Sequence, residues 1–220
     1  MSKYMIHICN KRLWYVHGHL VPSLISQGID QDDIILYRDI NNDGCLKSSI
    51  NSFKLAAEQE FDGMWHLQDD VLICSDFKKR TEENDDGIVC GFASSYDKNP
   101  IKGKVTGVDN MWFSFPCIRI PTSILKHYTI WCDSYIINDN RYKNWIESNK
   151  NDDLLFRYFL KSYYKDVEAL NLAPNLVEHV DWLIGGSMIN NDRDRIIRSL
   201  YWKENNLVDE LSSQLKYRSL

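Results

Sequence analysis

The chain has 220 residues, of which 44% are hydrophobic and 12% aromatic, and its formal net charge is −5 at neutral pH. This composition can supply a packed core, so it excludes a chain that is disordered throughout. The acidic balance argues against binding through a strongly basic surface, so neither nucleic acid nor an anionic membrane is the expected partner.

The first 75 residues alternate apolar runs with helical patterns. Three continuous apolar runs predict strands: 4–9, 34–37 and 64–67. A helical segment is predicted over 11–27, restarting near Pro22. The helix after the second strand has one apolar face: Leu46, Ile50, Phe53 and Ala57. The order is therefore β-α-β-α-β with continuous rather than alternating apolar strands, which is typical of a parallel sheet covered on both faces.

Two adjacent carboxylates, Asp69 and Asp70, follow the third strand and precede another apolar run, 71–74. Burying a carboxylate is costly unless a cation or hydrogen-bond donors compensate it, so the pair is a candidate for holding a divalent metal. An exposed loop tip or a helix cap would also explain it. Because ligands bind outside the carboxyl ends of parallel strands, we expect Asn10, Asp39 and the acidic pair at one edge of the sheet.

Beyond residue 76 the pattern is less regular. Strands are predicted over 88–93 and 111–120, and helices open near Pro121 and at 154. Charged residues over 78–87 predict a solvated helix end and loop, and the polar segment 94–110 has the length of a mobile active-site loop. A short extended segment, 173–179, ends in a histidine. The tail over 192–215 is amphipathic, with an expected buried stripe: Ile196, Leu200, Leu207 and Leu211.

Three features together resemble glycosyltransferases of the GT-A fold, particularly small bacterial and phage-encoded members. They are the β-α-β-α-β half that ends in hydrophobic-x-Asp-Asp-Val, the acidic opening of a later helix, and the Pro-Asn-Leu-Val-Glu-His segment followed by Gly-Ser. The resemblance covers residues 4 to 190. It implies an α/β, GT-A-like fold with a Rossmann-like nucleotide-binding half, a mixed central sheet and helices on both faces.

The same resemblance implies one domain over 1–220. Its parts are a nucleotide-binding half at 1–75, an acceptor-side half at 76–190 and a C-terminal helical tail at 191–220. The implied activity is transfer of a sugar from a nucleoside diphosphate sugar, with a UDP-sugar favoured, to a hydroxyl group. The acceptor would be a glycan, a lipid or a protein.

In that family the acidic motif holds Mn²⁺ or Mg²⁺, and the ion holds the diphosphate of the donor. The resemblance assigns Asp70 and His179 to the metal, and Asp69 to the ribose or the sugar. The sequence departs from the usual pattern at Gln68, where many members have an acidic residue, so the ion has either one protein carboxylate or two. His179 is otherwise explained as a partly buried histidine bonded to a backbone carbonyl.

The nucleotide sugar itself has further implied contacts. Asn10 would line the base pocket, Asp39 would reach the base or the ribose, and Lys47 would meet the nucleotide or its phosphates. Trp112 and Trp182 would stack against sugar rings. Lys47 also fits an ordinary exposed helix lysine, and both tryptophans fit core positions.

Asp152 and Asp153 precede the apolar helix that begins at 154. Together with Asn151 they fit a helix cap whose acidic residues favour the positive end of the helix dipole. In inverting members of the family, an acid at such a position removes the proton from the attacking hydroxyl. The resemblance therefore makes Asp153 or Asp152 the general base, with Asp153 preferred; a retaining enzyme would not need it.

Two other functions stay open. A nucleotidyltransferase shares the front half and a carboxylate-bound metal, but it usually has a Gly-rich, basic segment after the first strand. Here Lys11 and Arg12 are basic and no glycine run is present. A catalytically silent binding protein that keeps the fold is favoured by Gln68. Neither a G-x-G-x-x-G nor a G-x-x-x-x-G-K-[ST] motif occurs where a dehydrogenase or a P-loop kinase would need it.

The cysteines and the start of the chain indicate the compartment. The six cysteines are scattered without C-x-x-C spacing: Cys9, Cys45, Cys74, Cys90, Cys117 and Cys132. This spacing argues against a structural zinc site or a disulfide framework and fits a reducing environment. No signal peptide opens the sequence and no apolar stretch approaches ~20 residues, so we expect a cytoplasmic protein.

Overall fold

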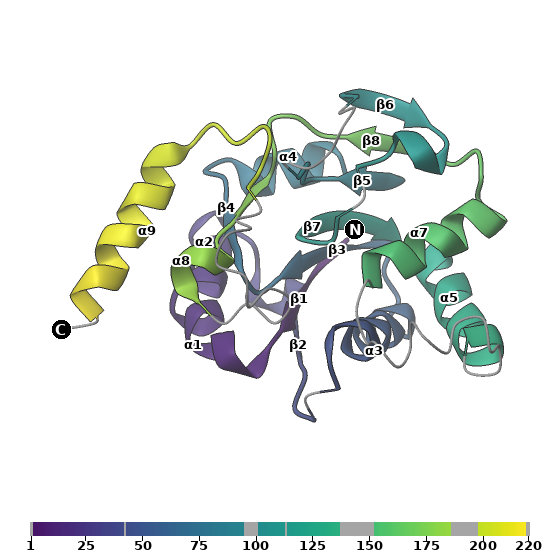
Figure 1. The fold of residues 1–220 in the computed structure, drawn as a ribbon, viewed down its shortest axis with the longest axis horizontal. Coiled ribbons are helices and arrows are strands. Elements are labelled where there is room, and N and C mark those ends of the chain that lie inside the picture. The colour runs from purple at the N-terminus through teal and green to yellow at the C-terminus, as the bar shows by residue number, and fades with distance from the viewer. Residues whose placement is uncertain are drawn as a thin grey trace.

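The computed structural model describes residues 2–41, 43–94, 101–112, 114–136, 152–185 and 198–218. Within these ranges one mixed sheet has seven strands, in the order β2 (Ile34–Arg38), β1 (Lys3–Ile8), β3 (Gly63–Gln68), β7 (Cys117–Pro121), β5 (Ile88–Cys90), β8 (Glu168–Asn171) and β6 (Gly103–Thr106). A small second sheet pairs β4 (Val71–Ile73) with β9 (Val177–His179). Helices lie around the large sheet (Figure 1), so the predicted α/β fold with a mixed central sheet is confirmed.

The helices connect and cover the strands. Their bounds are α1 (Leu13–Tyr15), α2 (Val21–Ser26), α3 (Cys45–Ala57), α4 (Phe77–Glu83), α5 (Thr122–Trp131), α7 (Asp152–Tyr163), α8 (Asp181–Ile184) and α9 (Asn205–Arg218). Shorter helical turns are η1 (Asn10–Arg12), η2 (Val16–Leu20), η3 (Gln31–Asp33), η4 (Val108–Asn110) and η5 (Cys132–Ile136). No helix in the described ranges combines the length and the hydrophobicity that crossing a bilayer requires.

The front half of the sheet is parallel, as the continuous apolar runs predict. Tyr4 of β1 lies opposite Ile34 of β2 on one side and opposite Trp65 of β3 on the other. The chain passes from β1 to β2 through α1, η2 and α2, and from β2 to β3 through α3. β7 then joins β3 in the antiparallel direction, which makes the sheet mixed.

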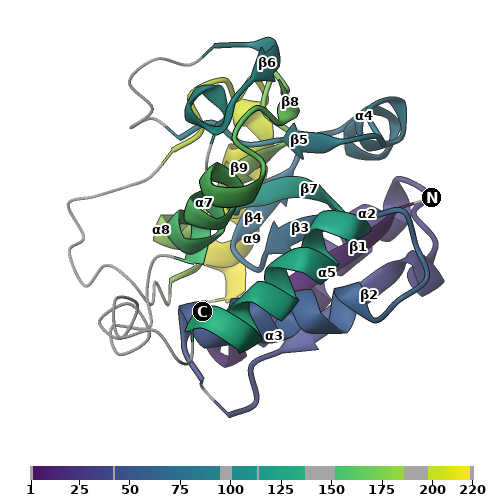
Figure 2. The same ribbon diagram turned by 90° about the vertical axis from the view of Figure 1, so that its right-hand side faces the viewer.

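Two apolar cores lie on opposite faces of the sheet because neighbouring strand residues point in opposite directions. Met5 and Met64 belong to the core beneath α3, α5 and α7, whereas Ile6 and Trp65 belong to the core beneath α1 and α2. Figure 2 shows α3 and α5 side by side on the first of these faces. The two cores explain why the strands contain so few polar positions.

Several predicted elements differ from the observed ones. β2 is an edge strand whose side chains are half-buried or exposed, so its apolar run is only partly covered, with Ile35 against one core and Ile34 against the other. The strand predicted over 111–120 begins only at Cys117, because Phe115 and Pro116 form a turn. The strand predicted over 88–93 ends at Cys90.

The C-terminal tail also differs from its prediction. Its helix begins at Asn205, and Leu200 is 39% exposed rather than part of the buried stripe. Leu211 is buried, as predicted, and Leu207 is half-buried. Ile196 lies outside the described residues.

Gly91, directly after β5, is a position where packing leaves no room for a side chain. A Cβ atom there would lie 2.7 Å from Sγ of Cys117 and 2.9 Å from Cδ1 of Leu176. We expect Gly91→Ala to lower the free energy of unfolding by about 1–3 kcal/mol, because overpacking a dense core forces its neighbours to move. Urea unfolding measures this. Glu60→Ala, at an exposed loop position, is the control, and an equal effect in both variants would contradict the prediction.

Candidate functional site

The carboxyl ends of β1, β2 and β3 meet at one edge of the sheet. β1 lies between β2 and β3. The chain runs from β1 to β2 on one side and then returns past β1 to β3 on the other side. The gap between β1 and β3 is therefore the topological switch point, which is where open α/β sheets bind ligands. The backbone N–H of Cys9, just after β1, donates to Oδ2 of Asp69, just after β3, at 2.5 Å and so joins the two strand ends.

The acidic pair is buried at this switch point and is compensated by Arg12. Nη1 of Arg12 lies 2.8 Å from Oδ1 of Asp69 and 2.5 Å from Oδ2 of Asp70. All three residues are at most 5% exposed. Nε of Arg12 also donates to the carbonyl oxygen of Gly185 at 3.3 Å. Two buried carboxylates thus share one guanidinium nitrogen. Removing any of the three groups would leave a buried charge without its partner.

His179 comes to the acidic pair through the second sheet. Val71 lies opposite His179 in the antiparallel β4–β9 pair, and the backbone N–H of Val180 donates to the carbonyl oxygen of Asp70 at 2.8 Å. Nε2 of His179 is 3.3 Å from Oδ2 of Asp70, and Nδ1 is 3.1 Å from Oδ1 of Asp181, which opens α8. Both ring nitrogens therefore face carboxylate oxygens.

These contacts set the ionisation of the cluster. Burial and the neighbouring Asp70 raise the pKa of Asp69 to about 7, even though Arg12 lowers it. Burial alone would raise the pKa of Asp70, but His179 and Arg12 hold it well below its usual value. Burial alone would lower the pKa of His179, but Asp70 and Asp181 raise it to about 10. At neutral pH the cluster contains a carboxylate, an imidazolium and a guanidinium.

The predicted metal ligands, Asp70 and His179, are in contact, but the described side chains do not fit a divalent ion. Asp69 uses one oxygen for Arg12 and the other for Cys9, and Oδ2 of Asp70 contacts Arg12 and His179. Only Oδ1 of Asp70 has no donor among the described residues, and one carboxylate oxygen does not supply the set of oxygen ligands that a divalent ion takes. To bind a metal, Nε2 of His179 would have to give up its contact with Oδ2 of Asp70. Within the described ranges, no group of three or more His, Cys, Asp and Glu side chains is arranged to hold a metal ion.

Asn10 and Asp39 lie at the same edge of the sheet. Nδ2 of Asn10 donates to the carbonyl oxygen of Asp39 at 2.6 Å and ties the end of β1 to the end of β2. The carboxylate of Asp39 accepts the backbone N–H groups of Asp43 and Gly44, at 2.8 and 3.2 Å, and so shapes the loop before α3. Lys47 is exposed and pairs with Asp43 at 2.6 Å, one helical turn away, rather than with the acidic pair.

The two candidate tryptophans have different surroundings. Trp112 is 2% exposed and stacks on Tyr201 with ring centroids 5.4 Å apart. Because both its faces are covered, this placement does not support the expected sugar-stacking role. Trp182 lies on α8, three residues after His179, and is 37% exposed. Arg198 lies over its ring at 4.4 Å from the centroid.

Asp152 and Asp153 are the first two residues of α7, so the helix begins two residues earlier than the predicted start at 154. Oδ1 of Asp152 accepts the N–H of Asp153 at 3.0 Å, and its carboxylate lies against Cys45 and Ser49 of α3. Burial and the neighbouring Asp153 raise the pKa of Asp152 to about 7. Burial also raises the pKa of Asp153, which accepts the N–H of Leu154 at 2.7 Å. Asn151 lies outside the described residues.

The first turns of α3 contact both β1 and Asp152. Oγ of Ser48 on α3 lies 2.6 Å from Nε2 of His7 on β1, within hydrogen-bond distance. Burial lowers the pKa of His7 to about 4, although the charges of Asp39 and Asp70 act to raise it. Ser49, the next residue of α3, contacts Asp152. A row of polar side chains thus runs from the switch point to the N-terminus of α7.

Arg12 and Asp181 were not among the residues that the sequence analysis assigned to the site. One signal pointed to Arg12: a pair of carboxylates between apolar runs needs a cation, and Arg12 follows the end of a strand that is adjacent to theirs. No comparable signal marked Asp181. Its contact with His179 depends on where β9 ends and α8 begins.

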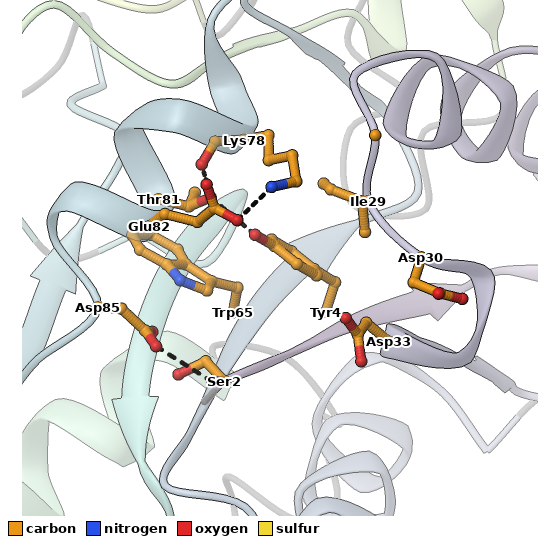
Figure 3. A pocket seen from close by; sticks show the side chains of 11 residues that line it. Ser2, Tyr4, Ile29, Asp30, Asp33, Trp65, Lys78, Thr81, Glu82 and Asp85 are labelled. Atoms are coloured by element: carbon orange, nitrogen blue, oxygen red, sulfur yellow. Dashed lines mark hydrogen bonds and ion pairs between the residues drawn. The ribbon is translucent and has the colours of Figure 1, made fainter.

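A cavity of about 250 Å³ lies at the opposite edge of the sheet, where β1 and β3 begin. Figure 3 shows its acidic side chains around Tyr4. Glu82 is paired with Lys78, and Asp85 accepts from Nε of Arg119 at 2.8 Å. Because these acids are neutralised by neighbours and lie at the amino ends of the strands, we place the candidate site at the other edge.

Comparisons with known proteins do not assign the chain to a family. No protein-family model matches it, and no curated protein matches it. Among solved structures, a UDP-glucose pyrophosphorylase from Acinetobacter baumanii is similar over 78% of this chain and 70% of that chain, with 12% sequence identity and a TM-score of 0.35. A likeness at this TM-score assigns neither a family nor a function.

Proposed function

We propose that this chain is a glycosyltransferase that binds a nucleoside diphosphate sugar at the switch point between β1 and β3. The observation that supports this is the buried cluster of Asp69, Asp70, Arg12 and His179 at that edge. Buried ion pairs contribute little net stability, so such a cluster is not required to hold an α/β domain together. Perturbed ionisable groups at a ligand-binding edge are typical of functional sites.

The nucleoside would lie over the ends of β1 and β2. Asn10 and Asp39 are already joined there by a hydrogen bond, and Asp69 is held by Cys9 at the end of β1. Oδ1 of Asp70 is buried and has no hydrogen-bond donor among the described residues, so a sugar or ribose hydroxyl is a suitable partner for it. Trp182 is 37% exposed, and a sugar would stack on the face of its ring that Arg198 does not cover.

The transfer step needs a base for the acceptor hydroxyl. The hydroxyl oxygen forms a bond to the anomeric carbon while the bond from that carbon to the diphosphate breaks, and the hydroxyl proton passes to a carboxylate. Asp152 now suits this role better than Asp153, because its pKa of about 7 lies near neutral pH and its Oδ2 has no partner in the described part of the chain. An inverting reaction follows from this assignment.

A nucleotidyltransferase is the second candidate, because Arg12 places a basic group directly after the first strand. The two activities give different products. Incubation with a nucleoside triphosphate and a sugar phosphate would release pyrophosphate only from a nucleotidyltransferase. Incubation with a nucleotide sugar and an acceptor would release a nucleoside diphosphate only from a glycosyltransferase.

The proposed donor site is tested by calorimetric titration of UDP, GDP and CMP, each in Mn²⁺ and each in EDTA. We expect one nucleotide to bind and Asp70→Asn to weaken it about tenfold or more, because the variant removes a buried charge that orders the site. Asp166→Asn, an exposed acid before β8, should bind like the wild type. If no nucleotide binds in either buffer, the proposed function is wrong and the chain is better regarded as a silent scaffold.

A further inference from the structure

We propose that Arg12 supplies the positive charge of the nucleotide site, so that the diphosphate of the donor binds without a divalent metal. The inference rests on the proposed nucleotide-sugar donor and goes beyond it, because it names the group that meets the diphosphate. It also departs from the metal dependence that the family resemblance implies. Three properties of Arg12 support it.

The first property is its position between the two carboxylates. A divalent ion would bridge the acidic pair to the diphosphate. In this chain Nη1 of Arg12 is already 2.8 Å from Asp69 and 2.5 Å from Asp70. An ion on the same oxygen of Asp70 would lie against the guanidinium, and two cations at that separation repel each other strongly in a buried site. The guanidinium therefore takes the place in which the ion would stand.

The second property is the nitrogen that Arg12 leaves open. Nη1 serves the two carboxylates and Nε donates to the carbonyl oxygen of Gly185. Nη2 has no acceptor among the described residues. A guanidinium is planar and presents several N–H groups in a fixed fork that suits phosphate oxygens. One nitrogen can hold the carboxylates while another binds the diphosphate, which is the same bridge that a metal makes.

The third property is the rigidity of its support. Arg12 ends η1, the short helical turn that follows β1, and its backbone N–H donates to the carbonyl oxygen of Cys9 at 2.9 Å. The same Cys9 donates its own N–H to Asp69. Gly185, which accepts from Nε, has a φ of +78°, a conformation that favours glycine. The guanidinium is thus fixed before any ligand arrives, which is what a binding group needs.

The deciding measurement compares nucleotide affinity in EDTA with that in Mn²⁺, on the wild-type chain. We expect the same dissociation constant, within about twofold, in both buffers. Binding in Mn²⁺ alone would overturn this inference while leaving the proposed donor site intact. Binding in neither buffer would remove the donor site, and this inference with it.

Variants of Arg12 test its part in binding. Arg12→Lys keeps the buried charge but loses the fork, so we expect it to fold and to bind the nucleotide about tenfold more weakly in EDTA. The neighbouring Lys11 is exposed, and Lys11→Met should bind like the wild type. An Arg12→Lys affinity equal to that of Lys11→Met would show that Arg12 does not meet the diphosphate. Far-UV circular dichroism and a thermal melt confirm that both variants are folded.

Discussion

Arg12→Met is expected to lower the free energy of unfolding by about 3–5 kcal/mol, the usual cost of removing one partner from a buried ion pair. Arg12 contacts both Asp69 and Asp70, and its loss leaves two neighbouring carboxylates in an interior site where, among the described residues, only His179 is a contacting cation. The cost is a large part of the 5–15 kcal/mol that typically stabilises a domain. Urea unfolding at neutral pH measures it.

Two further variants separate charge from packing. Lys11→Met removes the same charge from an exposed position one residue away, so we expect a change of at most about 0.5 kcal/mol. Combining Arg12→Met with Asp69→Asn and Asp70→Asn removes the guanidinium and both of its carboxylate partners together, leaves His179 beside Asp181, and should restore more than half of the lost stability. If Arg12→Met unfolds at the same urea concentration as Lys11→Met, Arg12 is not needed to stabilise the buried acidic pair in the folded chain.

The stability of the wild-type chain should fall between pH 4 and pH 7 through Asp152. Its pKa is about 7 in the folded chain, against an ordinary value of 3.8, and burial is the main cause. The folded state therefore keeps a proton that the unfolded state has already lost over this range, so stability falls as pH rises. Each unit of pKa difference corresponds to about 1.36 kcal/mol, so above pH 7 the loss of folding stability caused by Asp152 reaches roughly 4 kcal/mol. Asp152→Asn cannot ionise and should remove the part of the decrease that comes from Asp152, whereas the part that comes from Asp69, whose pKa is also raised to about 7, should remain.

The measurement is urea unfolding of the wild type and of Asp152→Asn at pH 5 and at pH 8. We expect the variant to gain stability relative to the wild type as the pH rises. Asp166→Asn, at an exposed position, should follow the wild type at both values. If the free energy of unfolding changes equally with pH in Asp152→Asn and in the wild type, the Asp152 carboxylate is not protonated in the folded chain. That result would also argue against Asp152 as the general base.

The apolar pattern of the sequence predicts the front half of the fold well. Continuous runs at 4–9, 34–37 and 64–67 became three parallel strands, and the helix between the last two matches its apolar face. The same method fails at 111–112 and 114–116, where apolar residues such as Trp112 are buried without forming a strand. An apolar run reports burial, and irregular chain can be buried as completely as a strand when its backbone finds other hydrogen bonds, as Trp112 does with Asn171.

The candidate site likewise has features that the sequence predicts and features that it does not. The sequence by itself determined that Asp69 and Asp70 follow a strand, at the edge formed by the carboxyl ends of the parallel strands, because strand direction follows from the β-α-β periodicity and from the connection rules of α/β sheets. Only the tertiary structure decided which groups neutralise them. Arg12 reaches the pair because β1 is the neighbour of β3, and His179 reaches it through the register of β4 and β9. Such contacts join residues far apart in the chain, and no local pattern encodes the packing that selects them.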